Sequence, residues 1–115
     1  MLAEWRDPGG SFDPPRLIAP RHVHYSDDEA WYVLQGRLRV QVGDKVVEAS
    51  AGAGVMVPRG TPHTHWNPGP DPVRYLLVMT PNIFHLIQRI HAMSERTPAA
   101  MRALFNQHDS EFLGG

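Results

Sequence analysis

The chain has 115 residues with a formal net charge of −1, from 11 basic and 12 acidic side chains, and no cysteine. This length fits one domain with a modest core, so residues 1–115 are expected to form a single domain. The near-neutral charge indicates neither a nucleic-acid nor a membrane surface, and the lack of cysteine excludes disulfides and thiolate chemistry. The chain contains no apolar run of roughly 20 residues and no apolar signal segment near residue 1, so we expect a cytoplasmic protein.

Residues 1–20 are predicted to be irregular, with at most a short strand at Trp5-Arg6, because prolines and glycines interrupt the segment. Short apolar or alternating segments with turn residues between them follow from residue 21 to residue 79. In 37–42 apolar and polar residues alternate strictly, and Gly43-Asp44 then fits a two-residue hairpin turn. We expect strands at 21–25, 30–35, 37–42, 45–49, 55–57, 62–66 and 73–79, which indicates a sandwich or barrel.

The pattern changes to helical spacing at residue 80. Thr80-Pro81 and Thr97-Pro98 each combine an N-cap residue with proline at the first helical position. Apolar residues then recur on one helical face, at Ile83, Leu86, Ile87, Ile90 and Met93, and again at Met101, Leu104 and Phe105. Two helices are therefore predicted over about 80–108, and we expect them to cover an edge or one face of the barrel.

Histidines and a carboxylate form a candidate metal site. His22 and His24 are two residues apart on an expected strand, so both imidazoles point to the same side, roughly 6.6 Å apart. The turn at 26–28 reverses the chain, so that Glu29 can open the next strand opposite them. His63 would supply a fourth ligand from a distant part of the chain. This set suits one divalent transition metal (Fe, Mn, Ni, Cu or Zn) and leaves positions open for water or substrate.

The spacing of these residues resembles the cupin superfamily. Its first motif is G-x(5)-H-x-H-x(3,4)-E-x(6)-G, and its second is G-x(5)-P-x-G-x(2)-H-x(3)-N. The chain matches the first from His22 through Gly36 and the whole of the second from Gly52 to Asn67, but Arg16 replaces the first glycine. The neighbouring Asp28 is a rival carboxylate, and the six residues before Gly36 select Glu29.

The resemblance implies an all-β fold, the cupin double-stranded β-helix or jelly-roll barrel, here with a C-terminal helical extension. The barrel is expected over about 21–79, with the metal near one mouth. The resemblance also implies a homodimer, since small cupins commonly pair sheet to sheet. The ending His108–Gly114 looks like the tail of small bacterial cupins that are often labelled quercetin-dioxygenase-like.

Strand parity assigns further residues to the cavity. Trp31 and Val33 share the parity of Glu29 and are expected to line it. The opposite wall, or the outer face if the register slips by one, would carry Tyr75, Leu77 and Met79.

Other polar residues have two interpretations each. Glu29 and His65 are candidates for proton transfer, and His65 is otherwise a supporting or rim histidine. Arg59 either meets an anionic substrate or lies in solvent. His85, His91 and His108 are interpreted as surface or packing residues. No residue is assigned to an organic cofactor.

Three functional hypotheses remain open, because one fold hosts many functions. The first is a dioxygenase-type metalloenzyme acting on a small enolisable or aromatic substrate. The second is a non-oxidative isomerase, epimerase or decarboxylase, and the third is a non-catalytic module that binds a small ligand. In each case the partner is a small molecule, with neither nucleic acid nor membrane.

Overall fold

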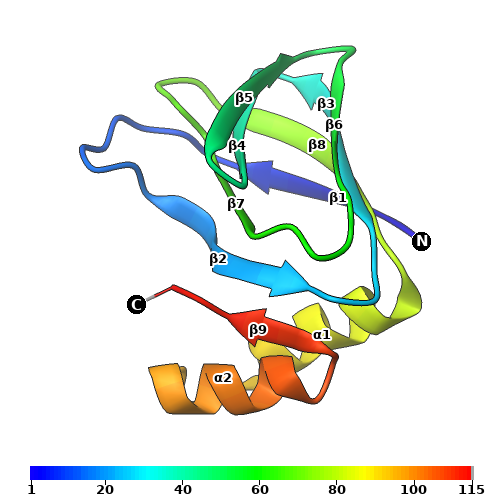
Figure 1. Ribbon diagram of the computed structural model, residues 1–115. Coiled ribbons are helices and arrows are strands. Elements are labelled where there is room, and N and C mark those ends of the chain that lie inside the picture. Colours follow the sequence, from blue (N-terminus) through cyan, green and yellow to red (C-terminus); the bar gives the residue numbers. More distant parts are fainter. Residues whose placement is uncertain (115) are drawn as a thin grey trace.

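Two antiparallel sheets face each other across the core in this computed structural model, which describes residues 1–114 (Figure 1). The first sheet has the order β1 (Leu2–Asp7), β8 (Val73–Val78), β3 (Glu29–Gln35) and β6 (Gly54–Val57). The second has the order β5 (Lys45–Ser50), β4 (Arg37–Val42), β7 (His63–Trp66), β2 (Leu17–His24) and β9 (Ser110–Phe112). This arrangement confirms the expected all-β jelly-roll barrel.

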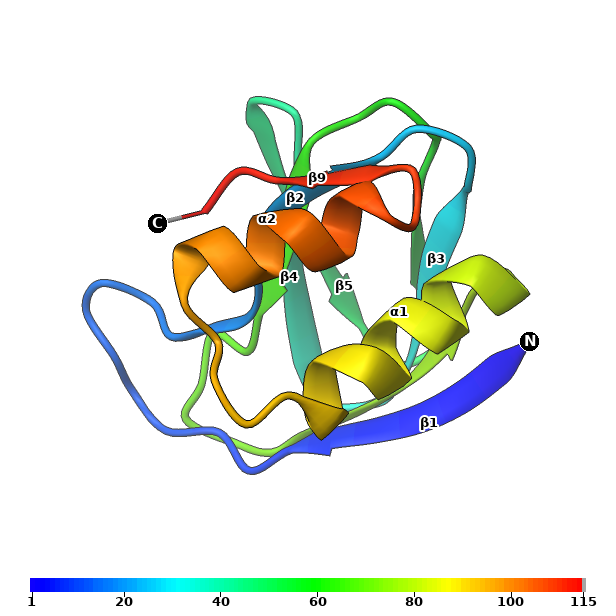
Figure 2. The same ribbon diagram turned by 90° about the horizontal axis from the view of Figure 1, so that it is seen from below.

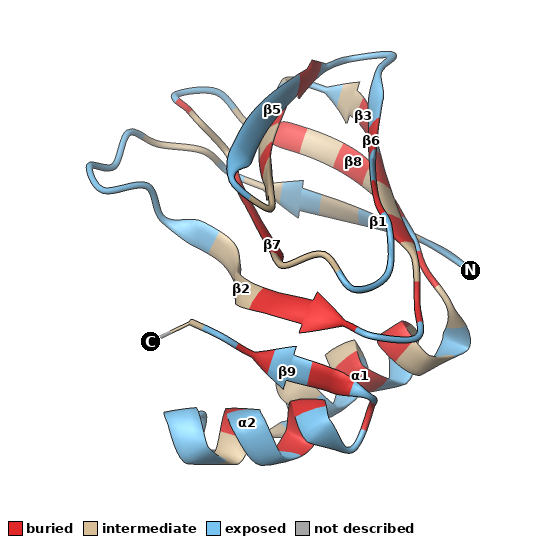
Figure 3. Ribbon diagram, viewed as in Figure 1, coloured by how far each residue is buried: buried red, intermediate tan, exposed pale blue. Residues whose placement is uncertain are grey.

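The core lies between the sheets, because alternate side chains of each strand point inward. Figure 3 shows the resulting bands of buried residues along the strands. The inward set includes Trp31, Val33, Leu38, Val40, Tyr75 and Leu77, each at most 5% exposed. The register of β8 is therefore the one that points Tyr75 and Leu77 into the barrel.

The predicted hairpin between β4 and β5 is confirmed. Val42 pairs with Lys45, which leaves Gly43 and Asp44 as the two turn residues. Gly43 has φ of 60°, in the left-handed region that a tight hairpin turn requires and that glycine adopts without a steric penalty.

The prediction that residues 1–20 are irregular was wrong. Strand β1 pairs along its whole length with β8, and β2 begins at Leu17 rather than at residue 21. In β1, Ala3 and Trp5 pack against the core, while the alternate residues Leu2, Glu4 and Arg6 are exposed. The strand is too short for this alternation to stand out in the sequence. The interrupting prolines fall mostly in the β1–β2 connection, and Pro20 lies where the β2–β7 register is irregular, a position that tolerates proline.

Both predicted helix starts are confirmed. Helix α1 (Pro81–Ala92) begins after Thr80, whose Oγ1 accepts from the Ile83 N–H, and α2 (Pro98–Asn106) begins after Thr97, whose Oγ1 accepts from the Ala100 N–H. Among residues 1–114, neither helix is long and apolar enough to cross a membrane.

The helices lie across one end of the barrel, and α2 packs along β9, the edge strand of the second sheet, which agrees with the expectation that the helices cover an edge (Figures 1 and 2). Ile83 of α1 joins the barrel core, and Leu86 packs with α2 and with Phe112 of β9. Strand β9, which was not predicted, follows α2 and pairs with the end of β2, where His24 lies opposite Ser110. The apolar stripes of the helices therefore close the end of the barrel at which β2 ends.

Candidate metal centre

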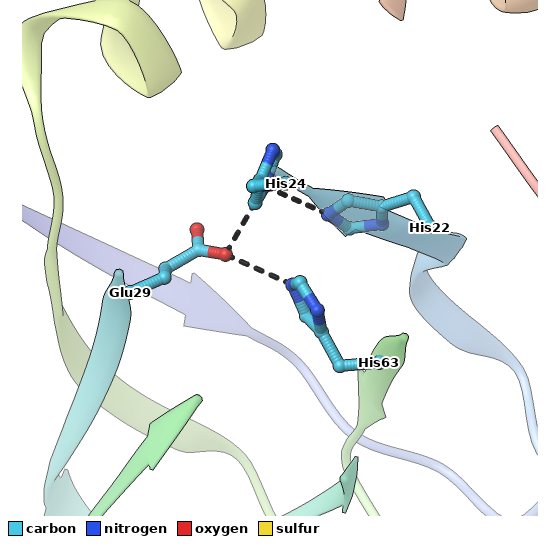
Figure 4. A group of neighbouring side chains, drawn as sticks. All are labelled: His22, His24, Glu29 and His63. Atoms are coloured by element: carbon cyan, nitrogen blue, oxygen red, sulfur yellow. Dashed lines mark hydrogen bonds and ion pairs between the residues drawn. The ribbon is translucent and has the colours of Figure 1, made fainter. Parts of the chain in front are cut away.

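Four buried side chains from three strands meet at the closed end of the barrel (Figure 4). His22 and His24 come from β2, and Glu29 and His63 are the first residues of β3 and β7. All four are at most 7% exposed. The structure thus brings together the residues predicted as ligands, with their candidate ligand atoms all within 4.8 Å of one another.

Contacts on the far side of each ring set the tautomers of His22 and His63. Nδ1 of His22 lies 2.6 Å from the Pro20 carbonyl oxygen, and Nδ1 of His63 lies 2.9 Å from that of Thr61. A carbonyl oxygen only accepts, so both Nδ1 atoms carry the proton and donate it. In the neutral rings, Nε2 therefore presents its lone pair to the centre of the cluster.

His24 is oriented in the same sense by a residue from the other end of the chain. Its Nδ1 lies 2.7 Å from Oγ of Ser110, and that hydroxyl donates to the His108 carbonyl oxygen at 3.0 Å. The hydroxyl proton is committed to the carbonyl, so Oγ accepts from His24 Nδ1. Ser110 was not predicted, and its distance of 86 residues from His24 leaves no local sequence signal.

Three imidazole nitrogens and a carboxylate oxygen thus converge. Nε2 of His24 lies 3.1 Å from Nε2 of His22, and Oε1 of Glu29 lies 3.4 Å from His24 Nε2 and 3.0 Å from His63 Nε2. Ligands held about 2.1 Å from one ion are separated by about 3.0 Å in octahedral and about 3.4 Å in tetrahedral geometry. The residues present therefore fit one transition-metal ion in both donor type and spacing.

The electrostatics of the cluster favour bound cations over protons. Burial, with the neighbouring His63 and His24, lowers the pKa of His22 to about 3, so its Nε2 keeps its lone pair at neutral pH. Burial alone would raise the pKa of Glu29, but its contacts with His24 and His63 outweigh burial and hold that pKa well below the ordinary value. A charged carboxylate and a neutral imidazole are the forms that bind a metal ion.

The two aspartates before Glu29 have other roles. Asp28, the rival ligand, is exposed and forms an ion pair with Arg59, with Oδ1 3.3 Å from Nε. Arg59 is exposed as well, so it lies in solvent and not in the cavity. Asp27 is buried and accepts hydrogen bonds from Thr80 and Asn82, each at 2.8 Å, which joins the β2–β3 turn to the start of α1. Glu29 is therefore held in place from the helix side.

His65 is buried beside the ligands, one layer farther into the barrel than His63. Its Nε2 lies 3.4 Å from the Tyr75 hydroxyl, and its ring centroid lies 5.2 Å from that of Trp31. Burial lowers the pKa of His65 to about 4 and raises that of Tyr75, so both are neutral at pH 7. Within residues 1–114, Nδ1 of His65 has no hydrogen-bond partner.

Two cavities adjoin the cluster. An inner cavity of about 80 Å³ reaches His22, His24 and Glu29, and an outer cavity of about 300 Å³ lies beyond His65. Of the residues predicted to line the cavity, Trp31 borders the inner one, Tyr75 the outer one and Leu77 both. Val33 and Met79 are instead packed in the core.

The three histidines after residue 80 differ in their exposure to solvent. His85 and His91 are exposed on α1, as interpreted from the sequence. His108 is 9% exposed, and its ring bonds to Asn82 and Arg89, so it is a buried packing residue that joins β9 to α1.

Comparison with known proteins identifies a matching family and similar structures. The cupin-domain family model matches residues 10–79. An uncharacterized protein of Methanocaldococcus jannaschii is 31% identical over 64 residues, which are 56% of this chain and 51% of that protein. The chain therefore spans about half the length of this relative.

Two solved structures extend the comparison. One is the protein TT1209 from Thermus thermophilus, with a TM-score of 0.58 and 26% identity over 68% of this chain and 69% of that chain. The other, a predicted oxalate decarboxylase from Thermotoga maritima, has a TM-score of 0.58 and 25% identity over 69% of this chain and 64% of that chain. The family match includes all four candidate ligands, whereas β1, both helices and β9 lie outside it.

The free energy of unfolding of the metal-free protein is expected to fall as the pH is lowered from about 6.5 to about 4. The folded-state pKa values of His22 and His65, about 3 and about 4, lie below the ordinary 6.5, so in this window only the unfolded chain takes up these protons. Each group then contributes about 1.4 kcal/mol per pH unit. Urea unfolding of chelator-treated protein at several pH values measures the slope.

The substitution His65→Gln should make that slope shallower, whereas His85→Gln, on the exposed face of α1, should leave it unchanged. Equal slopes for the wild type and His65→Gln would contradict the assignment of a buried neutral imidazole at this position.

Proposed function

This chain belongs to the cupin domain family, and we propose that its buried cluster holds one divalent transition-metal ion and that the protein is a small metalloenzyme of the dioxygenase type. The observation that carries the proposal is the convergence of three imidazole Nε2 atoms and a carboxylate oxygen, with three of the atom pairs at 3.0–3.4 Å and all atoms within 4.8 Å of one another. Contacts behind the rings direct the lone pairs inward. Fe, Mn, Ni, Cu and Zn all accept this donor set.

A bound ion would supply a Lewis acid that polarises an oxygen atom of the substrate. The remaining work belongs to the residues of the chain. Ile83 and Leu86 of α1 border the inner cavity and exclude bulk water from it. Glu29 is a carboxylate held next to the substrate position, and we assign it the removal of a proton from an enolisable substrate. His65, neutral and buried, is the second candidate for holding that proton, at Nδ1.

A non-oxidative decarboxylase is the second candidate function. It is favoured by the similarity to the predicted oxalate decarboxylase from Thermotoga maritima, at 25% identity. The same metal centre would support decarboxylation, because polarising a carboxylate or carbonyl oxygen of the substrate needs no dioxygen. An isomerase or epimerase would use the centre in the same way. The third candidate function is a module that binds a small ligand without turnover.

Protein purified without chelator or nickel resin is expected to contain about one equivalent of a transition metal. His63→Ala should lose most of it, because one of the imidazole ligands is gone. Ser110→Ala keeps the ligands but loses the bond that orients His24, so its metal affinity should fall about 10- to 100-fold. Glu29→Gln should weaken binding less than any histidine loss. Elemental analysis and competition with a chelator measure these effects.

His85→Ala provides the control for the metal measurements, because this exposed histidine on α1 lies outside the cluster. Its metal content should match the wild type. Wild-type metal content in His63→Ala would show that the ion binds elsewhere.

The metal-loaded protein is expected to consume dioxygen when a flavonol or an enolisable diketone is added, as followed with an oxygen electrode. Stoichiometric metal with no uptake, but with release of carbon dioxide from oxalate, would replace the dioxygenase proposal by the decarboxylase. Bound metal with neither reaction would favour the isomerase or the binding module.

The outer face of the sheet β1-β8-β3-β6 supports a further proposal, that the protein is a homodimer. Leu2, Tyr32, Met56 and Val78 are 41–67% exposed on this face. Leu2 pairs with Val78, Val78 with Ala30, and Ala30 with Met56, so these side chains adjoin across the strands. A contiguous apolar face of this kind is typical of a protein interface. A cytoplasmic location stays a prediction.

A dimer is expected in solution, and Met56→Lys should dissociate it because the charge would be buried between two apolar faces. Analytical ultracentrifugation measures the mass. Val46→Lys, on an exposed position of β5 in the other sheet, is the matched control and should remain dimeric. A monomeric wild type would refute the interface.

A further inference from the structure

The outer cavity has walls of apolar side chains. It lies between the barrel and α1 and has a volume of about 300 Å³, at the small end for ligand sites. Trp5 of β1, Leu77 of β8 and Met101 of α2 contribute to its lining, together with Ile18, Ile87 and Ile90. Such walls take the apolar body of a small organic molecule.

The outer cavity adjoins the inner cavity at the candidate metal centre. Both cavities border on the same side chains, which are Ala19, Pro20, His65, Leu77, Ile87 and Ile90. His65 therefore lies on the shared wall, with His22, His24 and Glu29 on the inner side. A ligand in the outer cavity would reach His65, and the candidate metal ligands lie on the other side of this residue.

Polar side chains lie in the wall of the outer cavity, those of Trp5, His65 and Tyr75. Nδ1 of His65 and Nε1 of Trp5 are inaccessible to water and have no partner anywhere in the described part of the chain. The Tyr75 hydroxyl has only a long contact of 3.4 Å with His65. The phenol of Tyr75 is a donor without a close acceptor, so a ligand with an oxygen atom at this end would satisfy it.

The rim of the outer cavity carries one positive charge, that of Arg96. Arg96, in the connection between α1 and α2, and His91 at the end of α1 are exposed and line the cavity. The ring of His91 lies 5.5 Å from that of Trp5. The arginine ion pairs found within residues 1–114 involve Arg16, Arg37, Arg39, Arg59 and Arg74, so Arg96 is free to meet an anion.

We propose that the outer cavity is the substrate-binding subsite and that it selects a small organic carboxylate with an apolar body and a hydroxyl or enol oxygen at the opposite end. The carboxylate meets Arg96 at the rim, the body lies against Trp5 and Leu77, and the oxygen reaches Tyr75 and His65 beside the metal centre. The inference rests on the proposed metalloenzyme function for its inner end only. The proposed contacts of the ligand's carboxylate and of its apolar body do not depend on a bound metal.

Half of the side chains that line this subsite lie outside the matched family domain. Trp5, Ile90, His91, Arg96 and Met101 all lie outside residues 10–79. The segments that cover the end of the barrel therefore also contribute to ligand selectivity.

The test is the binding of 4-hydroxybenzoate, compared with its neutral amide, to the protein as purified, measured by calorimetry and by quenching of indole fluorescence. The acid should bind more tightly than the amide. Arg96→Gln should weaken the binding of the acid about fivefold, which corresponds to the contribution of one exposed charge pair. It should leave the binding of the amide unchanged. Tyr75→Phe should weaken the binding of 4-hydroxybenzoate and leave the binding of benzoate unchanged, because benzoate lacks the hydroxyl group at the opposite end.

Arg102→Gln is the matched control, because Arg102 is exposed on α2 but does not line the cavity. It should bind as the wild type does. Trp5→Phe should remove most of the fluorescence response while calorimetry still detects binding, which locates the ligand. An amide that binds as tightly as the acid, or an Arg96→Gln variant that binds like the Arg102→Gln variant, would overturn the proposal.

Repeating the titration with chelator-treated protein separates the two proposals. Discrimination between acid and amide that persists without metal supports the subsite independently of the metalloenzyme function. Metal at one equivalent with no binding of either probe would refute the subsite and leave the metal centre standing.

Discussion

Four lone pairs directed at one buried point repel each other unless a cation lies among them. Nε2 of His22, His24 and His63 and Oε1 of Glu29 are in this situation, and the rest of the fold holds them there. Two carbonyl oxygens and the Ser110 hydroxyl bind the opposite ring nitrogens, so the rings cannot turn their N–H groups inward without breaking buried hydrogen bonds. The cluster is therefore preorganised for a cation.

The barrel lowers the free-energy cost of this arrangement. Strands β2, β3 and β7 carry the ligands at their ends, so that no backbone has to leave its sheet hydrogen bonds to reach the centre. Helix α1 and β9 then cover the centre, which removes water and strengthens every charge interaction inside. Asp27 joins the two parts, since it lies in the turn before Glu29 and bonds to Thr80 at the start of α1.

The molecule divides into a general scaffold and chain-specific walls. The family match covers the strands that carry the candidate ligands, and many chemistries are compatible with such a centre. The walls of the outer cavity come in large part from β1, α1 and the connection to α2. The reaction type and the substrate are thus separable questions, the first decided by the metal and its proton carriers and the second by the added segments.

Local patterns in the sequence determined the strands from β3 to β8, the hairpin at Gly43-Asp44, both helix starts and the choice of the four clustered side chains, because each depends on spacings of two to seven residues. Tertiary structure alone decided the rest. The pairing of β1 with β8, the position of the helices over the barrel mouth and the bond between Ser110 and His24 join residues far apart in the chain. No local propensity encodes such contacts, since they form only when burial of the apolar stripes brings both ends of the chain to the barrel.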